Sequence, residues 1–405
     1  MTIASAQKTL QTSTALYDRS FWIVAFSFLV SMAFATAPAP LYVVYQAHSN
    51  FSAFTITVIF AAYALGVVAS LFTVGHLSDR VGRRKLMLPS LALGFGSALI
   101  FLFAQNLSGL LIARFVSGLG IGMLTATATA YLMELHAKAH PGTGLRKAEI
   151  TATAANIGGL GMGPLVSGLL AEYAPAPLKL SYSIFAILLQ IALVLLLSTP
   201  ETASPVKGWK YRPQAVSVPH HERRTFAAAA MMAFVAFAMF GLFTSLAPAL
   251  IRGTLGISSL AVSGGVAFLV FAAAAVMQVF SSRWPLTAQT HWGLSALAVG
   301  LVVITGSMLF ASLTLLIVGG LIAGSGAGIA FKAGLGTAIR IAPEDQRGEV
   351  IAGVFLAGYL GMSVPVLLLG ALMLYISLIP AVLAFGALMA GLLIVTAVLA
   401  APRKR

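Results

Sequence analysis

Twelve long apolar runs separated by short polar segments constrain the fold of this chain more than any other feature of its sequence. They lie near residues 20–45, 53–77, 86–104, 108–136, 149–173, 179–198, 226–251, 258–281, 291–312, 314–339, 349–376 and 379–401. A helix of about 20 apolar residues crosses the ~30 Å hydrocarbon core of a bilayer. The composition agrees, because 59% of the residues are hydrophobic and only 8% are charged, which leaves too little polar surface for a water-soluble protein. The sequence therefore predicts an all-α integral membrane protein with twelve transmembrane helices.

Helices are expected rather than a membrane β-barrel. Lipid cannot satisfy unpaired backbone groups, so spanning segments are helices or closed barrels. Barrel strands alternate polar and apolar residues over about ten positions, whereas these runs are continuously apolar. Residues 1–19 are of mixed polarity and contain no short apolar segment before a small-residue cleavage site, so no cleavable signal peptide is expected.

The basic residues predict the orientation. If the N-terminus lies inside, 20 of the 24 Lys and Arg fall on the cytoplasmic side. These are Lys8, Arg19, Arg80, Arg83, Arg84, Lys85, Lys138, Arg146, Lys147, Lys207, Lys210, Arg212, Arg223, Arg224, Arg283, Arg340, Arg347, Arg403, Lys404 and Arg405. Such asymmetry is typical of multi-pass proteins of the plasma (cell inner) membrane, here with both termini cytoplasmic. The net charge of +14 has the same explanation, because basic loops are held against the anionic cytoplasmic surface of the bilayer. Nucleic-acid binding is therefore not expected.

A polar, proline-containing segment divides the chain in the middle. It predicts a six-helix bundle over 1–198, a cytoplasmic linker over 199–225 and a second six-helix bundle over 226–405. Short motifs recur six runs apart in the same order: 37–41 with 246–250, 118–122 with 324–328, and 160–162 with 360–362. Duplicated halves with Gly- and Pro-interrupted helices are typical of secondary transporters, whose binding site lies between the repeats.

The most charged short stretch lies between the second and third runs. Residues Gly75–Lys85 read GHLSDRVGRRK, in which Gly75 ends one helix and Gly82 turns the chain toward the next. This stretch resembles the signature loop of the major facilitator superfamily, which lies at the same place in that family. The twelve predicted helices, the central linker and the two pseudo-repeats resemble the same family.

The resemblance implies a conformational latch. Gly75 would let helices 2 and 11 approach, and Asp79 would point at the N-terminal end of helix 11, where the helix dipole favours an anion. Arg83 would pair with Glu134 at the cytoplasmic end of helix 4. Together they would hold the halves together on the cytoplasmic side and favour the outward-open state. The alternative is a plain positive-inside anchor made of Arg80, Arg83, Arg84 and Lys85.

The second half departs from this pattern. Residues 278–284 read QVFSSRW, in which the acid is missing and Arg283 alone corresponds to the basic residues of the loop. A second latch is therefore expected to be absent or altered.

The fifth run carries a glycine motif. Residues 159–168 read GLGMGPLVSG, which resembles the helix 5 motif of drug/proton antiporters in Gly159, Gly163, Pro164 and Gly168, with Ser167 where a glycine is usual. Close packing of backbones and a bend at proline explain the same residues without any coupling role. Both interpretations stay open at this point.

Two cations fall within predicted helices. Arg114 and Lys332 are costly inside a bilayer unless they face the interior of the bundle or reach the membrane surface. Other candidates for the substrate cavity are polar residues within the runs, which also pack well without touching a substrate: Tyr42, Tyr63, Asn156, Gln278 and Tyr359.

Chemistry-bearing residues are sparse. The chain has no cysteine, none of its ten acids falls in the middle third of a predicted helix, and its histidines lie near helix ends or in loops. No metal site, no cofactor and no enzyme activity are therefore expected. A proton carrier would have to involve Arg114 or Glu134.

These features favour a secondary transporter that works by alternating access. The leading hypothesis is export of small amphiphilic organic compounds, coupled to protons. An organic-anion uptake or exchange carrier is the alternative, since Arg114 and Lys332 are not opposed by mid-membrane acids. A transporter-like sensor without turnover is the third. The expected partners are a small-molecule substrate, protons and the lipid bilayer, and a monomer is compatible with each hypothesis.

Overall fold

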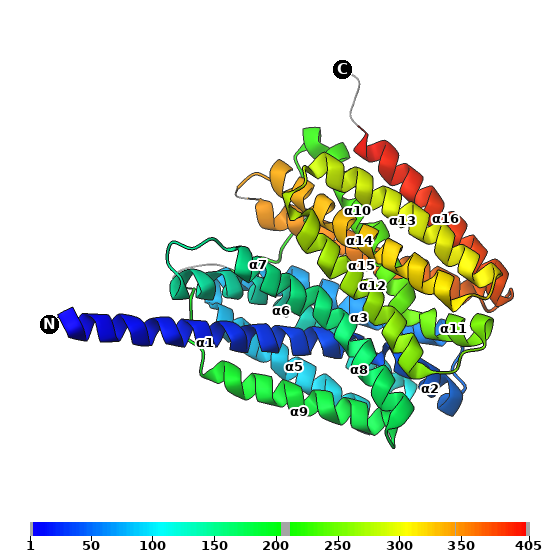
Figure 1. The fold of residues 1–405 in the computed structure, drawn as a ribbon, viewed down its shortest axis with the longest axis horizontal. Helices are drawn as coiled ribbons and strands as arrows, with labels where there is room; N and C mark the ends of the chain where they lie inside the picture. Colours follow the sequence, from blue (N-terminus) through cyan, green and yellow to red (C-terminus); the bar gives the residue numbers. More distant parts are fainter. Residues whose placement is uncertain (1–2, 204–210, 345, 402–405) are drawn as a thin grey trace.

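A computed structural model of the chain contains twelve helices that are long and apolar enough to span a membrane (Figure 1). It describes residues 3–203, 211–344 and 346–401, and of residues 3–13 and His76 only the backbone. The elements are α1 (Ile3–Thr36), α2 (Pro38–Ser49), α3 (Ala53–Thr73), η1 (Gly75–Leu77), α4 (Ser78–Val81), α5 (Arg83–Phe103), α6 (Leu107–Ala139), α7 (Arg146–Thr153), η2 (Ala154–Gly158), α8 (Gly159–Tyr173), α9 (Pro177–Leu197), η3 (His220–Glu222), α10 (Arg223–Ser245), α11 (Ala247–Leu255), α12 (Leu260–Phe280), η4 (Ser281–Arg283), α13 (Leu286–Leu309), α14 (Leu313–Ile341), α15 (Arg347–Leu372) and α16 (Leu378–Ala400). No strand lies among the described residues, and the predicted twelve-helix membrane fold is confirmed.

Matching breaks in the first span of each half support the pseudo-repeat. The first span passes from α1 to α2 at Ala37, and the seventh passes from α10 to α11 at Leu246. A proline lies in the first turn after each break, Pro38 and Pro248, where its missing N–H costs no helical hydrogen bond. The first span differs from the prediction in one respect, because α1 begins at Ile3 rather than near residue 20.

The fourth span packs against the second in the same way in both halves. A Cβ atom added to Gly118 on α6 would lie 2.1 Å from the carbonyl oxygen of Tyr63 on α3. One added to Gly324 on α14 would lie 2.3 Å from the carbonyl oxygen of Val270 on α12. Glycine is needed at both places for the backbones to approach this closely. The recurrence of these glycines in the sequence therefore reflects a repeated helix contact.

The two halves meet along α3 with α15 and along α8 with α12. We call the side on which α1 begins and α16 ends the terminal face, and the side that carries α2 and α11 the opposite face (Figure 1). Near the opposite face the halves are in close contact. A Cβ on Gly264 would lie 2.2 Å from the carbonyl oxygen of Pro164, and the backbone N–H of Leu260 donates to Glu172 at 2.7 Å.

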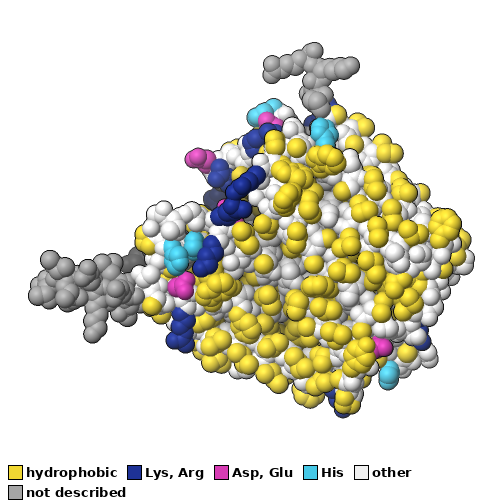
Figure 2. Space-filling model, in the orientation of Figure 1, with side chains coloured by type: hydrophobic (Ala, Val, Ile, Leu, Met, Phe, Trp, Pro, Cys, Tyr) yellow, Lys and Arg dark blue, Asp and Glu magenta, His cyan; other side chains and the backbone are white. Residues whose placement is uncertain are grey.

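The outer surface of the helices suits a lipid environment. Large apolar side chains are widely exposed, among them Phe103 (84%), Val302 (71%) and Leu65 (66%). Figure 2 shows an apolar flank, with the described Lys and Arg gathered mainly along the edge that belongs to the terminal face. Six of the basic residues behind the predicted orientation lie outside the described side chains: Lys8, Lys207, Lys210, Arg403, Lys404 and Arg405.

The described part of the predicted linker packs on the end of α3. The N–H of Gln214 donates to the carbonyl of Phe72 at 2.8 Å, and the hydroxyl of Tyr211 donates to the carbonyl of Thr73 at 3.1 Å. The segment therefore connects the halves along the terminal face.

Candidate functional site

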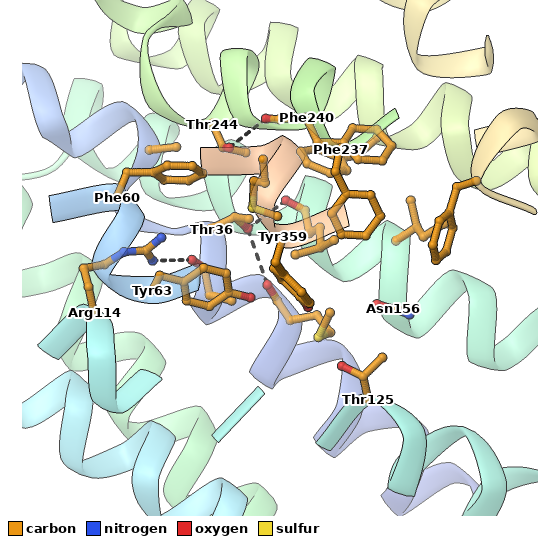
Figure 3. Close-up of a pocket in the computed structure, with 18 of the residues that line it drawn as sticks. Thr36, Phe60, Tyr63, Arg114, Thr125, Asn156, Phe237, Phe240, Thr244 and Tyr359 are labelled. Atoms are coloured by element: carbon orange, nitrogen blue, oxygen red, sulfur yellow. Dashed lines mark hydrogen bonds between the residues drawn. The ribbon is translucent and has the colours of Figure 1, made fainter. Parts of the chain in front are cut away.

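A cavity with about 750 Å³ of empty space lies between the two halves (Figure 3). Its walls come from α1, α2, α3, α6, η2 and α8 of the first half and from α10, α12, α14 and α15 of the second. Most of the lining is aromatic or methionine: Met32, Tyr42, Phe60, Tyr63, Phe237, Phe240, Phe271, Phe331, Phe355, Tyr359 and Met362. Such side chains form an adaptable apolar surface for a small organic molecule.

Arg114 is the one charged residue among the described residues that line this cavity. It lies seven residues after the start of α6, roughly 10 Å into the helix, and is only 2% exposed. Its Nη1 donates to the carbonyl of Ala35 at 2.6 Å, and its guanidinium lies 4.5 Å from the ring centre of Tyr63 and 5.5 Å from that of Phe60 (Figure 3). The side chain thus faces the interior of the bundle and does not reach the membrane surface.

The charge of Arg114 is only partly compensated. A carbonyl oxygen and two aromatic faces stabilise it, its Nε is buried without a hydrogen bond, and no carboxylate lines the cavity in the described part of the chain. A buried charge without an opposite charge is unfavourable. The site can therefore accept an anionic group beside apolar walls.

Four further predicted residues also line this cavity, namely Tyr42, Tyr63, Asn156 and Tyr359. The rings of Tyr63 and Tyr359 are 6.5 Å apart, one from each half, so they meet where α3 packs on α15. The hydroxyl of Tyr42 is buried and has no hydrogen bond among the described groups. It is a candidate donor for a bound molecule.

Asn156 lies in a π-helical segment that the sequence did not reveal. Residues Ala154–Gly158 form η2 between α7 and α8, and the Asn156 side chain is partly exposed to the cavity. Single π-turns within α-helices are frequent at functional sites. The neighbouring glycines at 158 and 159 were the available signal, because they permit unusual backbone geometry.

Lys332 and Gln278 are placed differently from the prediction. The Nζ of Lys332 on α14 donates to the main-chain carbonyl of Gln278 on α12 at 2.8 Å. Neither residue is among those that line the cavity. The physical reason is that the long lysine side chain places its ammonium group at a main-chain carbonyl of the neighbouring helix α12.

The burial of the lining residues indicates where the cavity is accessible. Toward the opposite face Ala39, Tyr42 and Thr244 are at most 4% exposed, whereas toward the terminal face Thr125 and Phe355 are partly exposed. Together with the close contacts between the halves near the opposite face, this indicates a cavity that opens toward the terminal face.

The loop between the second and third spans lies on the terminal face. Gly82 has φ of +126°, a conformation that favours glycine. The buried Arg83 donates from Nε and Nη2 to Oε1 of Glu134 at 3.1 and 2.8 Å, and it also pairs with Asp79. The pair of Arg83 with Glu134 that the resemblance implied is thus present, although the latch role stays a prediction.

Two implied contacts between the halves are not made in this conformation. The side chain of Asp79 is 69% exposed, and its ion pair is with Arg83 of its own half rather than with the start of α15. The nearest backbone atom to Gly75 outside its own helix is the carbonyl oxygen of Gly122 on α6, so Gly75 does not bring α3 against α15 here. Arg80 is exposed beside them. These differences fit halves that are apart at the terminal face.

Glu201 is a site residue that sequence reasoning missed. Its carboxylate accepts the backbone N–H of Arg83 at 2.7 Å and of Arg84 at 3.1 Å, so it caps the start of α5. It also fills the space beside Gly82, where a Cβ would lie 2.4 Å from its Oε2. The signal was an acid directly after the sixth apolar run, on the same face as the charged loop.

The glycines of the fifth span serve close packing. A Cβ on Gly159 would lie 2.8 Å from the carbonyl oxygen of Leu29 on α1, and one on Gly163 would lie 2.0 Å from that of Ala33. The hydroxyl of Ser167 donates to the carbonyl of Ala37 at 2.7 Å. Pro164 and Gly168 contact α12 of the other half. The packing interpretation therefore explains this motif, and its coupling role stays a prediction.

Among the described residues no group of three or more His, Asp or Glu is arranged to hold a metal ion.

Comparisons with known proteins identify relatives. A family model described as Major Facilitator Superfamily matches residues 24–305. An uncharacterized MFS-type transporter of Methanocaldococcus jannaschii is 27% identical over 153 residues, which cover 37% of each chain. The arabinose-proton symporter of Bacillus subtilis is 35% identical over 85 residues, 21% of this chain and 18% of that protein. The D-xylose transporter of Levilactobacillus brevis is 37% identical over 75 residues, 18% of this chain and 16% of that protein. These alignments therefore span well under half of the relatives' length.

Solved structures agree on the fold over nearly the whole chain. The nucleoside transporter NupG superposes with a TM-score of 0.73 at 9% identity, covering 94% of this chain and all of that one. The human organic anion transporter MFSD10 superposes with a TM-score of 0.69 at 17% identity, covering 95% of this chain and 99% of that one.

Proposed function

Since the chain belongs to the Major Facilitator Superfamily and is a membrane transporter of that type, we propose that it carries small amphiphilic organic anions by alternating access. The observation that carries this proposal is Arg114, a buried cation that lines an apolar cavity without a carboxylate partner. A carboxylate or similar group would complete its coordination, and the aromatic and methionine walls would hold the apolar body of the substrate.

In this proposal the terminal face is cytoplasmic and the chain lies in the cell inner membrane. The excess of Lys and Arg on that face supports the orientation. The conformation described above is then the inward-facing one, with the substrate cavity accessible from the cytoplasm. The outward-facing state would require the contacts of α8 with α12 to separate near Gly168 and the terminal face to close. Asp79 is well placed for that closure, since its side chain is exposed on the terminal face.

Proton-coupled export of amphiphilic compounds is a second candidate. The likeness of the fifth span to drug/proton antiporters supports it, and Gly168 contacts α12 of the other half. No carboxylate lines the cavity in the described residues, so the proton would have to bind elsewhere. The partly buried Glu134 beside Arg83 is the candidate for that role.

A flux assay separates these functions. Purified protein in proteoliposomes is given amphiphilic carboxylates and, as matched controls, their uncharged amides and amine analogues. The anion carrier exchanges the carboxylates and discriminates against the amides by at least tenfold. Transport of amines or amides that dissipates a proton gradient supports the antiporter instead. Saturable binding without flux supports a sensor and contradicts both transport functions.

A further inference from the structure

A second cavity, with about 1090 Å³ of empty space, lies on the terminal face of the second half. It is an open hollow bounded by α10, α13, α14 and α16, and it shares no described residue with the central cavity. Four basic side chains line it, His221, Arg224, His291 and Arg340, and none of the described lining residues is acidic. The charged groups of this lining are thus two arginines, with two histidines beside them, which favours an anionic ligand.

The equivalent place in the first half, at the end of α6, contains a carboxylate. The packed glycines Gly118 and Gly324 are 206 residues apart, and so are Glu134 and Arg340. Glu134 accepts two hydrogen bonds from Arg83, and its negative charge offsets the positive charge of that arginine. Arg340 brings a positive charge to the equivalent place on α14. The second half has therefore replaced an acid by a base here.

A second carboxylate is also without a counterpart. In the first half Glu201 caps the start of α5 through the backbone N–H groups of Arg83 and Arg84. The equivalent helix α13 begins at Leu286 with no side-chain cap, and Leu286 and Thr287 line the cavity. Two helices begin and two end around this cavity, so their dipoles offset one another and its positive charge comes from side chains.

Several donors at this site are unpaired. Arg340, His221 and His291 form no ion pair or hydrogen bond with a described residue, and Arg224 donates only to the carbonyl of Val398 at 3.0 Å. Thr337, which is 7% exposed, lines the cavity with a hydroxyl that has no hydrogen bond to any described group. His221, His291 and Arg340 are exposed at the mouth of the cavity, so their side chains are accessible to an acceptor that enters it.

We propose that this cavity binds the phosphate group of an anionic phospholipid. A phosphate offers several acceptor oxygens to Arg224, Arg340 and Thr337 and replaces the carboxylates that the first half supplies. The lipid source is favoured by the apolar side chains of Met232, Leu286 and Leu399 in the lining.

The neighbouring surface of α16 can hold the acyl chains. Ile394, Val395 and Val398 are 65%, 49% and 61% exposed along that helix, directly before the cavity. Basic pockets between membrane helices on the cytoplasmic side are a known form of lipid headgroup site. This proposal does not depend on what the central cavity transports.

A thermal-shift titration of the purified, delipidated protein in neutral detergent tests it. Short-chain phosphatidylglycerol is compared with phosphatidylcholine of the same chain length, inorganic phosphate and glycerol phosphate. Phosphatidylglycerol is expected to raise the melting temperature saturably, because a ligand stabilises the state that it binds. Arg340→Gln should weaken the apparent affinity for phosphatidylglycerol about fivefold. The double variant with Arg224→Gln should weaken it about fivefold further.

The matched control is Arg283→Gln, which removes a cation from the same face outside this cavity and should leave the affinity unchanged. The melting temperature of each variant without lipid shows that it is folded, as expected for the exposed Arg340. Equal shifts with phosphatidylcholine, or equal shifts with glycerol phosphate or inorganic phosphate, would overturn the anionic-lipid assignment. So would an affinity that both cavity variants leave unchanged.

Discussion

Arg114 and Ala35 are joined by a 2.6 Å hydrogen bond from Nη1 to the main-chain carbonyl, which connects α6 to α1 just before the break of the first span. The carbonyls before Pro38 and Pro40 receive no bond from a proline N–H, and Ser167 from α8 donates to the carbonyl of Ala37. The cation of the cavity is thus attached to α1 two residues before its break at Ala37. A substrate that contacts Arg114 would lie beside Ala35 and Thr36, which also line the cavity at this break.

Replacement of Arg114 separates its charge from its structural hydrogen bond. Arg114→Gln should weaken binding of an amphiphilic carboxylate about 10- to 100-fold, because a charge-assisted hydrogen bond contributes about 1.5–3 kcal/mol. Arg114→Lys should recover part of that loss. Calorimetric titration of the purified variants measures both. The control is Lys332→Gln, an intramembrane cation bonded to Gln278 outside the cavity, and it should bind normally. If the two Gln variants lose affinity equally, the anion site is not at Arg114.

The sequence was sufficient for the architecture because lipid leaves few choices. Continuous apolar runs of about 20 residues must be helices, and the repeated glycines at 118 and 324 follow from one packing rule used twice. Five of the seven candidate cavity residues line the cavity for a related reason, since a polar group within a span turns away from lipid.

Side-chain partners far apart in sequence could not be foreseen. Glu201 caps α5 although it lies 118 residues after Arg83 in the sequence. Lys332 donates to a main-chain carbonyl, and because every residue has one, the sequence does not indicate which carbonyl accepts. The π-turn at Asn156 and the basic cavity between α10 and α16 depend on packing that no local pattern encodes.

Gly163→Ala should destabilise the first half. The added Cβ would lie 2.0 Å from the carbonyl oxygen of Ala33, so α8 and α1 would have to separate, at a cost of about 1–3 kcal/mol. The melting temperature in detergent should fall by several degrees. Gly265→Ala on α12 is the control, because its Cβ meets nothing within 4 Å, and it should be neutral or slightly stabilising. Equal melting temperatures for the two variants would contradict the tight packing of α8 on α1.

Glu201→Gln should weaken the terminal-face network. The carboxylate that caps α5 would become neutral, which is expected to reduce the free energy of unfolding by about 1 kcal/mol. Chemical or thermal unfolding measures the loss. Glu344→Gln removes an exposed acid on the same face and serves as the comparison. A loss for Glu344→Gln as large as that for Glu201→Gln would show that general surface charge, not the cap, is responsible.

Asp79→Asn should reduce transport and leave expression intact. In the conformation described here Asp79 is largely exposed and its pair with Arg83 contributes little to stability, on the order of 0–1 kcal/mol. The latch hypothesis gives the same carboxylate a partner at the start of α15 when the terminal face closes. Flux in proteoliposomes and melting temperature are measured together. Normal flux with normal stability would exclude the latch role.

Cysteine labelling can test the direction in which the cavity opens, and the chain is suited to it because it has no native cysteine. Thr125→Cys places a thiol at the end of the cavity near the terminal face, where Thr125 is partly exposed. Ala39→Cys places one near the opposite face, where Ala39 is 2% exposed. A membrane-impermeant maleimide should label the first at least about tenfold faster, since the thiolate must be accessible to react.

Applied to inside-out and right-side-out vesicles, the reagent also tests the proposal that the terminal face is cytoplasmic, which requires fast labelling of Thr125→Cys in inside-out vesicles only. A substrate that drives the halves toward the other conformation should slow labelling at 125 and speed it at 39, because one accessible end closes as the other opens. Equal labelling rates in both vesicle types would contradict a cavity closed at the opposite face.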